Sequence, residues 1–286
     1  MHKFLYKILF LLLSFFITQY FIFFVTNTFL TKKSNFRITR YFSNQKHKYF
    51  VLGNSRGVNS VNESYAKKTL HKDLINLSFN GMPFENLFSL YQDINANNNN
   101  STIFIEVSSL SNNDIDNSYV YYSNQSNYIS KLYPDIKYRI LPLLKFNNEL
   151  FLRNIYYLFK NDDDWINRNT INSSLINSIS ISEKSKIINN YNLLSENIEK
   201  INKIAIKNNN KVIYFLAPYY PKYLNTLSDY NKLCNYFINY NKVSSFIDLN
   251  KVKLTDFQFA DRIHTNYNGS YILTKNLLDN NLQLTH

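Results

Sequence analysis

The fold is decided by the stretch Tyr49-Phe50-Val51-Leu52-Gly53-Asn54-Ser55. Apolar residues that end in a glycine indicate a buried parallel strand followed by a tight turn. Further short apolar runs occur at 74–77, 103–107, 212–216 and 246–249, and helix-like stretches lie at about 56–70, 84–96, 184–208, 225–240 and after Asn268. This alternation predicts an α/β domain with a mostly parallel five-stranded sheet, covered by helices on both faces as a three-layer sandwich.

The N-terminal region is strongly apolar. From Ile8 to Thr26 there are nineteen residues without a charge, which at about 1.5 Å per residue is long enough to cross roughly 30 Å of hydrocarbon. We expect residues 1–30 to form an uncleaved transmembrane anchor in contact with the lipid bilayer. A cleavable signal peptide is the alternative, because Lys3 and Lys7 provide a positive n-region, but no small-x-small cleavage site follows.

The rest of the chain divides into two further parts. Residues 31–48 are polar and aperiodic, which predicts a juxtamembrane linker, and residues 49–286 form the folded domain, with an insertion of irregular helices at about 111–182. We expect a single-pass membrane protein with this domain on the extracytoplasmic side. Both orientations stay open, because positive charges after the span argue against export by the positive-inside rule: Lys32, Lys33, Arg37 and Arg40.

Composition narrows the class of protein. Hydrophobic residues make up 45% of the chain and charged residues 18%, which excludes a disordered chain. The net charge is +12, but the Lys residues are scattered and form no basic stripe, so we expect a solvated basic surface and no nucleic-acid partner. Cys234 is the single cysteine; an intramolecular disulfide is excluded, and its apolar helical context predicts a buried structural thiol.

Glycine is scarce, and its positions are informative. The chain has four glycines: Gly53 and Gly57 flank Ser55, Gly81 follows the second apolar run, and Gly269 follows Asp261-Arg262-Ile263-His264. Glycine is needed where the backbone bends sharply or approaches a ligand closely. A serine between a buried strand and a helix start lies among unpaired N–H groups that favour negative charge. Ser55 is therefore a candidate nucleophile.

A serine nucleophile needs a base, which is in turn oriented by a third group. His264 is the best candidate base, because the other histidines lie before the span, in the linker, in a charged turn or at the last residue. Asp261 precedes it by three residues, a spacing that lets the carboxylate hold one imidazole nitrogen while the other faces Ser55. The alternative is that Asp261 and His264 merely cap the last helix.

These motifs together resemble the SGNH, or GDSL-like, hydrolase superfamily. Leu52-Gly53-Asn54-Ser55 resembles its first block, Asn76-Leu77-Ser78-Phe79-Asn80-Gly81 its second, and Asp261-Arg262-Ile263-His264 its last. The resemblance implies a flavodoxin-like sheet and an oxyanion hole that uses the backbone N–H groups of Ser55 and Gly81. Asn80 is a further candidate for oxyanion or substrate binding.

The third block departs from the family pattern. The family has Gly-x-Asn-Asp after the third strand, with the Asn side chain completing the oxyanion hole, whereas residues 105–113 contain no glycine. Ser108, Ser109 or Asn112 are candidate substitutes. Loss of one oxyanion donor typically costs on the order of 100- to 1000-fold in rate.

Arg56 and a tyrosine pair are the remaining candidates. Arg56 directly follows Ser55 and suits bidentate binding of a substrate carboxylate or phosphate, or else a surface ion pair. Tyr219 and Tyr220 follow the fourth apolar run between two prolines; they suit a sugar-stacking wall or simply a rigid strand-exit loop.

Three functions remain in view. The first is a serine esterase or O-acyltransferase. The chain resembles the membrane-anchored branch of the superfamily that includes alginate O-acetylation and teichoic-acid D-alanine transfer proteins. This resemblance implies a substrate that is an acyl ester of a cell-envelope or secreted polysaccharide, or an acylated small molecule, and a partner membrane protein that donates the acyl group. The second is a catalytically impaired subunit that binds or assembles a polysaccharide system. The third, an anion-cradling nucleotide loop at 53–57, lacks the P-loop Lys. No metal or organic cofactor is expected, because His, Cys and carboxylates do not cluster at ligand spacing.

Overall fold

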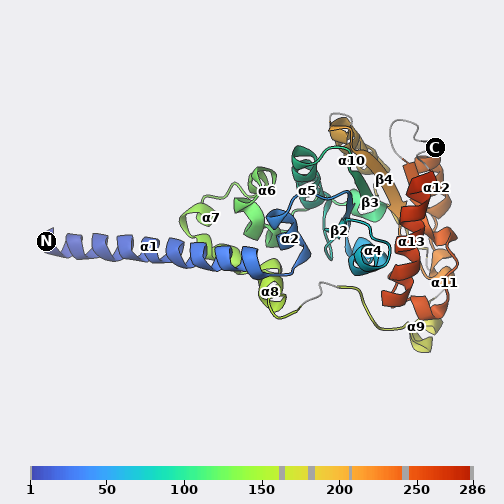
Figure 1. The fold of residues 1–286 in the computed structure, drawn as a ribbon, viewed down its shortest axis with the longest axis horizontal. Coiled ribbons are helices and arrows are strands. Elements are labelled where there is room, and N and C mark those ends of the chain that lie inside the picture. The colour runs from blue at the N-terminus through green and yellow to red at the C-terminus, as the bar shows by residue number, and fades with distance from the viewer. Residues whose placement is uncertain (1, 161–164, 180–183, 206–207, 240–244, 284–286) are drawn as a thin grey trace. The chain divides into compact units, whose positions relative to one another are not determined.

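The computed structural model describes residues 2–160, 165–179, 184–205, 208–239 and 245–283. Parts of the expected insertion and helices, and the last three residues of the expected domain, lie outside the described residues. The chain forms two units: residues 1–45 with 116–163, and residues 46–115 with 164–286. The second unit carries the sheet. Figure 1 labels helices and strands of both units.

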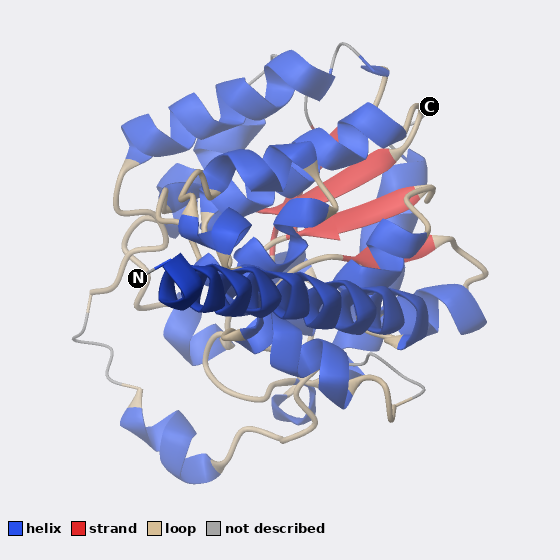
Figure 2. Ribbon diagram, turned by 90° about the vertical axis from the view of Figure 1, so that its left-hand side faces the viewer, coloured by secondary structure: helices blue, strands red, loops and turns tan. Residues whose placement is uncertain are grey.

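The sheet confirms the α/β class. Its five strands are all parallel and run in the order β2-β1-β3-β4-β5, and Figure 2 shows them side by side among helices. Their bounds match the apolar runs of the sequence to within one residue: β1 (Tyr49–Leu52), β2 (Leu74–Asn76), β3 (Thr102–Glu106), β4 (Lys211–Leu216) and β5 (Ser245–Asp248).

Helices of the sheet unit connect these strands. They are α3 (Ser55–Ser60), α4 (Glu63–Lys68), α5 (Phe84–Asn97), α9 (Ser173–Ser178), α10 (Tyr191–Ala205), α11 (Pro221–Leu224), α12 (Tyr230–Asn239) and α13 (Tyr267–Gln283). Short 3₁₀ helices follow β3 and β5: η1 (Val107–Ser111), η5 (Leu249–Lys251) and η6 (Asp256–Gln258). α5 matches the helix expected at 84–96, the stretch expected at 56–70 forms the two short helices α3 and α4, and α10 and α12 lie within the stretches expected at 184–208 and 225–240.

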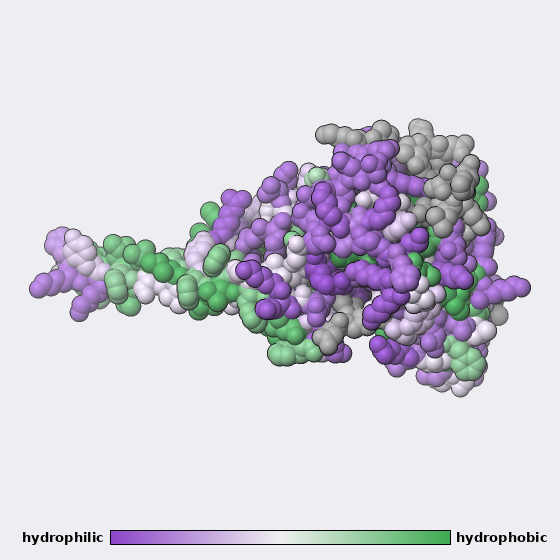
Figure 3. Space-filling view, viewed as in Figure 1, coloured by the Kyte–Doolittle hydropathy of each residue, from purple (hydrophilic) through white to green (hydrophobic). Residues whose placement is uncertain are grey.

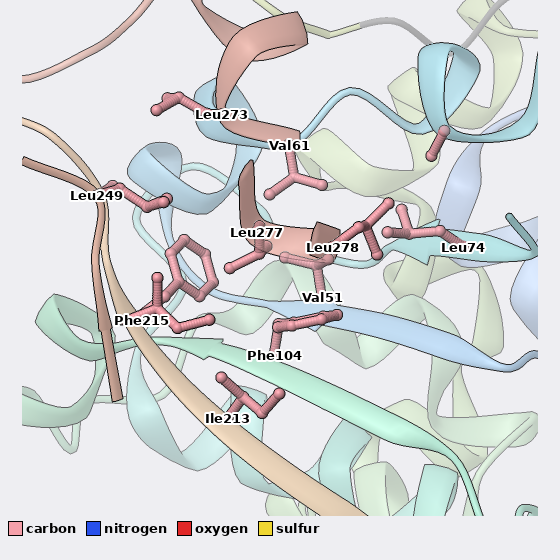
Figure 4. Close-up of a cluster of buried hydrophobic side chains, with 13 residues drawn as sticks. Val51, Val61, Leu74, Phe104, Ile213, Phe215, Leu249, Leu273, Leu277 and Leu278 are labelled. Carbon is pink, nitrogen blue, oxygen red and sulfur yellow. The ribbon is translucent and has the colours of Figure 1, made fainter. Parts of the chain in front are cut away.

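On one face of the sheet, the hydrophobic core lies between the strands and α13. Alternate residues of the central strands, among them Val51, Phe104 and Ile213, pack against Leu273 and Leu277 of α13 (Figure 4). Side chains that alternate along a strand point to opposite faces. On the other side, the Tyr214 hydroxyl donates to the Asn202 amide oxygen of α10 at 3.2 Å. The apolar strands are thus covered from both sides.

The single cysteine lies on α12. Cys234 is half-buried, and its thiol lies 3.7 Å from Asp248 Oδ2 at the end of β5. Burial, together with the nearby Asp248 carboxylate, raises the pKa of this thiol to about 11. Cys234 is therefore protonated near neutral pH and unsuited to nucleophilic chemistry.

The first unit is helical. It contains the long apolar helix expected at the N-terminus, α1 (His2–Lys33), which by length and composition is able to cross a membrane. The other elements are α2 (Arg37–Ser43), η2 (Asn117–Asn124), α6 (Asn127–Leu132), α7 (Lys137–Ile140), η3 (Pro142–Phe146) and α8 (Glu149–Tyr156). Figure 3 shows the apolar side chains along α1.

Residues 31–48 do not form the aperiodic linker that the sequence predicts. α1 continues to Lys33, and α2 follows with Ile38 and Tyr41 fully buried. α2 is fixed by side-chain hydrogen bonds to the insertion, because Thr39 Oγ1 and Tyr122 Oη lie 2.8 Å apart and Asn154 Nδ2 donates to the same Tyr122 oxygen at 2.8 Å. The segment 116–160 of the expected insertion thus packs on α1 and α2 to form a unit of its own.

Candidate active site

Ser55 lies at the start of α3, directly after the carboxyl end of β1. Asn54 is the N-cap of this helix, and its side-chain oxygen accepts from Arg56 N at 3.0 Å. Asn and Ser are favoured at helix starts because their side chains satisfy otherwise unpaired N–H groups. The sequence Gly-Asn-Ser therefore turns the chain from strand to helix and leaves Ser55 only partly buried.

His264 and Asp261 come from the loop before α13, and the structure brings both to Ser55. His264 Nε2 lies 2.8 Å from Ser55 Oγ, and His264 Nδ1 lies 2.8 Å from Asp261 Oδ2. Ser55 and His264 are 209 positions apart in the chain. The distances allow Nδ1–H to donate to the carboxylate while unprotonated Nε2 accepts the serine proton, which is the arrangement that general-base activation requires.

The Asp261 carboxylate is held by backbone as well as by the imidazole. Its Oδ1 accepts from Ile263 N at 2.8 Å and from His264 N at 2.9 Å. Partial burial acts to raise the pKa of Asp261, but the hydrogen bonds from His264 and these backbone groups outweigh it, so the pKa lies below its ordinary value. Asp261 is thus an ionised carboxylate at neutral pH.

One polar contact joins the base-bearing loop to the serine-bearing helix, and a second joins the residue that caps α4 to α13. Thr265 Oγ1 donates to the carbonyl of Asn59 on α3 at 2.8 Å. Asn62, at the N-cap of α4, donates its backbone N–H to Thr274 Oγ1 of α13 at 2.8 Å. All four residues are buried. Buried polar groups are costly unless paired, so these contacts fix α3 and α4 against the segment that carries His264 and the helix that follows it.

The turn after β2 holds two exposed candidates, Asn80 and Gly81. Gly81 has a φ of +69°, a left-handed conformation that favours glycine, and Asn80 beside it is exposed. Phe79 N donates to Gly53 O at 3.0 Å, which ties this turn to the end of β1. The Ser78 side chain before this turn packs closely on Gly57 of α3, since a Cβ on Gly57 would lie 2.5 Å from Ser78 Oγ.

Ser108 and Ser109 have other partners than the expected oxyanion. The Ser108 hydroxyl donates to Glu106 Oε2 and accepts from Asn54 Nδ2 at 3.0 Å. Ser109 Oγ accepts from Asn54 N at 2.8 Å. Both serines therefore support the turn beneath Ser55, and the Ser108 proton is directed at a carboxylate. Asn112 is exposed, and its backbone carbonyl accepts from Phe84 N at 2.7 Å.

Arg56 departs from both sequence interpretations, because it is neither a surface ion pair nor free for bidentate binding. Its side chain is buried, with 4% of the residue exposed. Nε donates to Glu106 Oε1 at 3.3 Å, Nη2 donates to the carbonyl of Ala217, and the guanidinium carbon lies 3.5 Å from the centroid of the Tyr219 ring. Tyr219 is thus a packing partner for Arg56.

Tyr220 does not form an exposed sugar-stacking wall either. It is 8% exposed, packs edge-on against Phe259, and donates its hydroxyl to Asp256 Oδ1 at 3.0 Å. The strand-exit interpretation of the tyrosine pair therefore fits the structure better than the wall.

Glu106 is the residue that the sequence interpretation missed. It ends β3 fully buried, and its two oxygens accept from Arg56, from Ala217 N at 3.4 Å and from Ser108 N at 3.0 Å. A buried charge needs such partners. The signal was present in the sequence, because an acidic residue at the end of an otherwise apolar strand has to find a buried cation.

Within the described residues, no three His, Cys, Asp or Glu side chains gather into a group that could hold a metal ion. The partly exposed polar groups at the end of β1 are instead a serine, an imidazole and a carboxylate joined in series. This arrangement is chemically suited to nucleophilic attack by an oxygen. Against this geometry, protein-family models give no match to the chain, and no curated protein matches it at a significant level.

Proposed function

We propose that the chain is a membrane-anchored serine esterase or O-acyltransferase that acts on an acyl ester of a cell-envelope or secreted polysaccharide. The observation that carries the proposal is the series of two 2.8 Å contacts from Ser55 Oγ through the His264 ring to Asp261 Oδ2. Such a series is recognised by geometry and roles rather than by sequence position.

The fold supports the same proposed function. Parallel sheets with the strand order 2-1-3-4-5 bind ligands beyond the carboxyl ends of their strands, and Ser55 lies directly beyond β1 in a sheet of that order. This position agrees with the three-layer, flavodoxin-like architecture of SGNH hydrolases. The polysaccharide substrate rests on the resemblance to membrane-anchored members of that superfamily, together with an N-terminal helix able to span a bilayer.

The first half of the reaction transfers the acyl group to the enzyme. Ser55 Oγ attacks the ester carbonyl carbon while His264 Nε2 takes its proton, and Asp261 stabilises the imidazolium that forms. The tetrahedral intermediate then collapses. Its bond to the sugar oxygen breaks, and the imidazolium returns the proton to that leaving oxygen, which leaves an acyl ester on Ser55 and a neutral imidazole.

The second half regenerates the serine. A water molecule or a sugar hydroxyl attacks the acyl carbon, gives its proton to His264 Nε2 and displaces Ser55 Oγ, which recovers that proton. Water as the acceptor gives hydrolysis, and a sugar hydroxyl gives transfer. Backbone N–H groups of Ser55 and Gly81 are the proposed oxyanion donors in both halves.

A fluorophosphonate probe tests the proposal, since it phosphonylates an activated serine. We expect the full chain in detergent to be labelled and the variant Ser55→Ala to be unlabelled. Ser173→Ala is the matched control, because Ser173 also follows an Asn N-cap at the start of a helix. Labelling lost in Ser55→Ala and kept in Ser173→Ala supports the enzyme.

A non-catalytic binding or assembly subunit is the second candidate function. The observation that favours it is the pairing of the Ser108 and Ser109 hydroxyls with Glu106 and Asn54, which leaves the third oxyanion donor without an evident side chain. A folded wild-type chain that is not labelled at Ser55 supports this second function and contradicts the first.

A further inference from the structure

The surroundings of α1 change along its length. From His2 to Ile22 no side chain is buried, whereas Phe23 and Leu30 are buried against their own unit. The exposed apolar residues include Phe4, Leu11 and Ile17. From Phe23 on, the protein covers part of this 32-residue helix, while Phe24, Val25 and Phe29 remain exposed.

Contacts within the unit fix α7 and η3 at one level of α1. The Tyr20 hydroxyl donates to the carbonyl of Arg139 on α7. The Phe23 ring stacks on Phe146 of η3, with ring centroids 5.3 Å apart and planes at 23°. α7 and η3 thus lie beside residues 20–23, where the protein first covers α1.

The part of α1 before this level is about as long as the hydrocarbon core of a bilayer is thick. From Phe4 to Phe23 the helix rises by about 30 Å at about 1.5 Å per residue, which matches the hydrocarbon core of a typical membrane. If the bare part of α1 spans that core, then α7 and η3 lie where the helix leaves it, at the boundary with the lipid headgroups.

The exposed side chains of α7 and η3 suit that boundary. Ile136 is 66% exposed, and Ile140 and Leu144 are each 43% exposed, at a spacing of four residues. Arg139, which precedes Ile140 in the chain, and Lys131, five positions before Ile136, are also exposed, and Lys137 pairs with Asp135 at 2.8 Å. Apolar side chains flanked by Lys and Arg are typical of segments that lie in a membrane interface.

We propose that Ile136, Ile140 and Leu144 form an interfacial collar that inserts into the bilayer where α1 leaves the hydrocarbon core, with Lys131 and Arg139 directed to lipid phosphates. The occupant is lipid because the collar continues the bare apolar surface of α1 at the height of the core boundary. The collar sets how far α1 can enter the membrane. It depends on α1 crossing the bilayer and does not depend on chemistry at Ser55.

Tryptophan quenching by brominated lipids tests the collar in the full chain. The single native tryptophan, Trp165, is replaced by Phe, which keeps an aromatic ring against Phe79. Ile140→Trp is then placed in nanodiscs that hold one copy each, made from lipids brominated near the start of the acyl chains. Ile136→Trp repeats the test if Ile140→Trp folds poorly.

Phe159→Trp is the matched control in the same unit. Phe159 is 85% exposed and apolar, but the residue that follows α8 contacts the segment just after α1, since Asn35 N donates to Tyr157 O at 3.2 Å. That level lies about 15 Å or more beyond Phe23 along the helix. A tryptophan there should remain outside the acyl chains.

We expect strong quenching and a blue-shifted emission for Ile140→Trp, and neither for Phe159→Trp. Three outcomes overturn the collar. The first is an unquenched, water-exposed Ile140→Trp; the second is an Ile140→Trp shielded from water but not quenched, which indicates a protein partner; the third is equal quenching of both variants, which places the boundary elsewhere.

Discussion

The two carboxylate oxygens of Asp261 contact different groups. Oδ2 faces the imidazole, while Oδ1 is held by two backbone N–H groups. Asp261→Asn should keep the loop but place an amide against His264 Nδ1, which disfavours the tautomer with unprotonated Nε2. We expect kcat for hydrolysis of p-nitrophenyl acetate to fall on the order of 100- to 10,000-fold, with little change in KM. Unchanged kcat contradicts an orienting role for Asp261.

The same carboxylate links stability to pH. Its pKa is lowered in the folded chain, so its contribution to stability is fully present above the ordinary Asp pKa of about 4 and is lost as the pH falls through the lower, folded value. We expect urea unfolding of the wild type and of Asp261→Asn to differ most near neutral pH. The difference should shrink below about pH 4; a difference that grows on acidification contradicts the direction of the shift.

The pair Arg56–Glu106 is the most deeply buried charge in the site. Nε and Oε1 are 3.3 Å apart, with 5% and 0% of the two side chains exposed. Glu106→Gln leaves a buried guanidinium without its counter-charge, which should cost about 3–5 kcal/mol of unfolding free energy. The double variant Arg56→Met/Glu106→Gln removes both charges and should recover most of that loss in denaturant titrations. A double variant no more stable than Glu106→Gln contradicts the idea that the unpaired buried guanidinium causes the loss of stability.

Single residues also show how far sequence reasoning reaches. The sequence makes Ser55, His264 and Asp261 candidates because glycine and histidine are scarce, and the structure brings the three side chains together. The position of Arg56 was not predictable in the same way. Whether an arginine beside a serine faces solvent or the core depends on Glu106 and Tyr219, which are distant in sequence. The same partners decide that Ser108 supports a turn.

At the scale of elements, the site depends on α3 and α13 keeping their register. Thr265 Oγ1 bridges to the Asn59 carbonyl at 2.8 Å. Thr265→Val keeps the shape but loses this donor and leaves a buried carbonyl unpaired, at a cost of about 1–3 kcal/mol. We expect slower fluorophosphonate labelling of Ser55 and a lower midpoint in urea. Thr265→Ser is the control that retains the hydroxyl, and equal behaviour of the two variants contradicts the bridge.

Elements differ in how well the sequence specifies them. The sequence predicts the strands closely, because a run of four or five apolar residues between two turns fits a buried strand of a parallel sheet and few other structures. α2 was not predicted: it is seven residues long, too short for a visible helical period, and its apolar residues are buried by segments more than seventy positions away. The expected linker therefore contains a helix whose stability comes from the insertion.

For the whole molecule, the expected membrane location depends on α1. An uncleaved span predicts that the chain purified from cells keeps residues 1–30 and remains in the membrane fraction after alkaline carbonate extraction. Intact mass spectrometry and fractionation measure both. A mature chain that begins after residue 30 and is released by carbonate indicates a signal peptide instead. Neither result bears on the sheet, which belongs to the other unit.

The separation of Ser55 from His264 by 209 positions has a consequence for biosynthesis. At roughly 5–20 residues per second, the ribosome adds the histidine about 10–40 s after the serine. During that interval the nascent chain has a hydroxyl but no base to activate it. A ribosome-stalled intermediate that lacks the final segment should therefore not react with a fluorophosphonate probe or with acylated molecules around it.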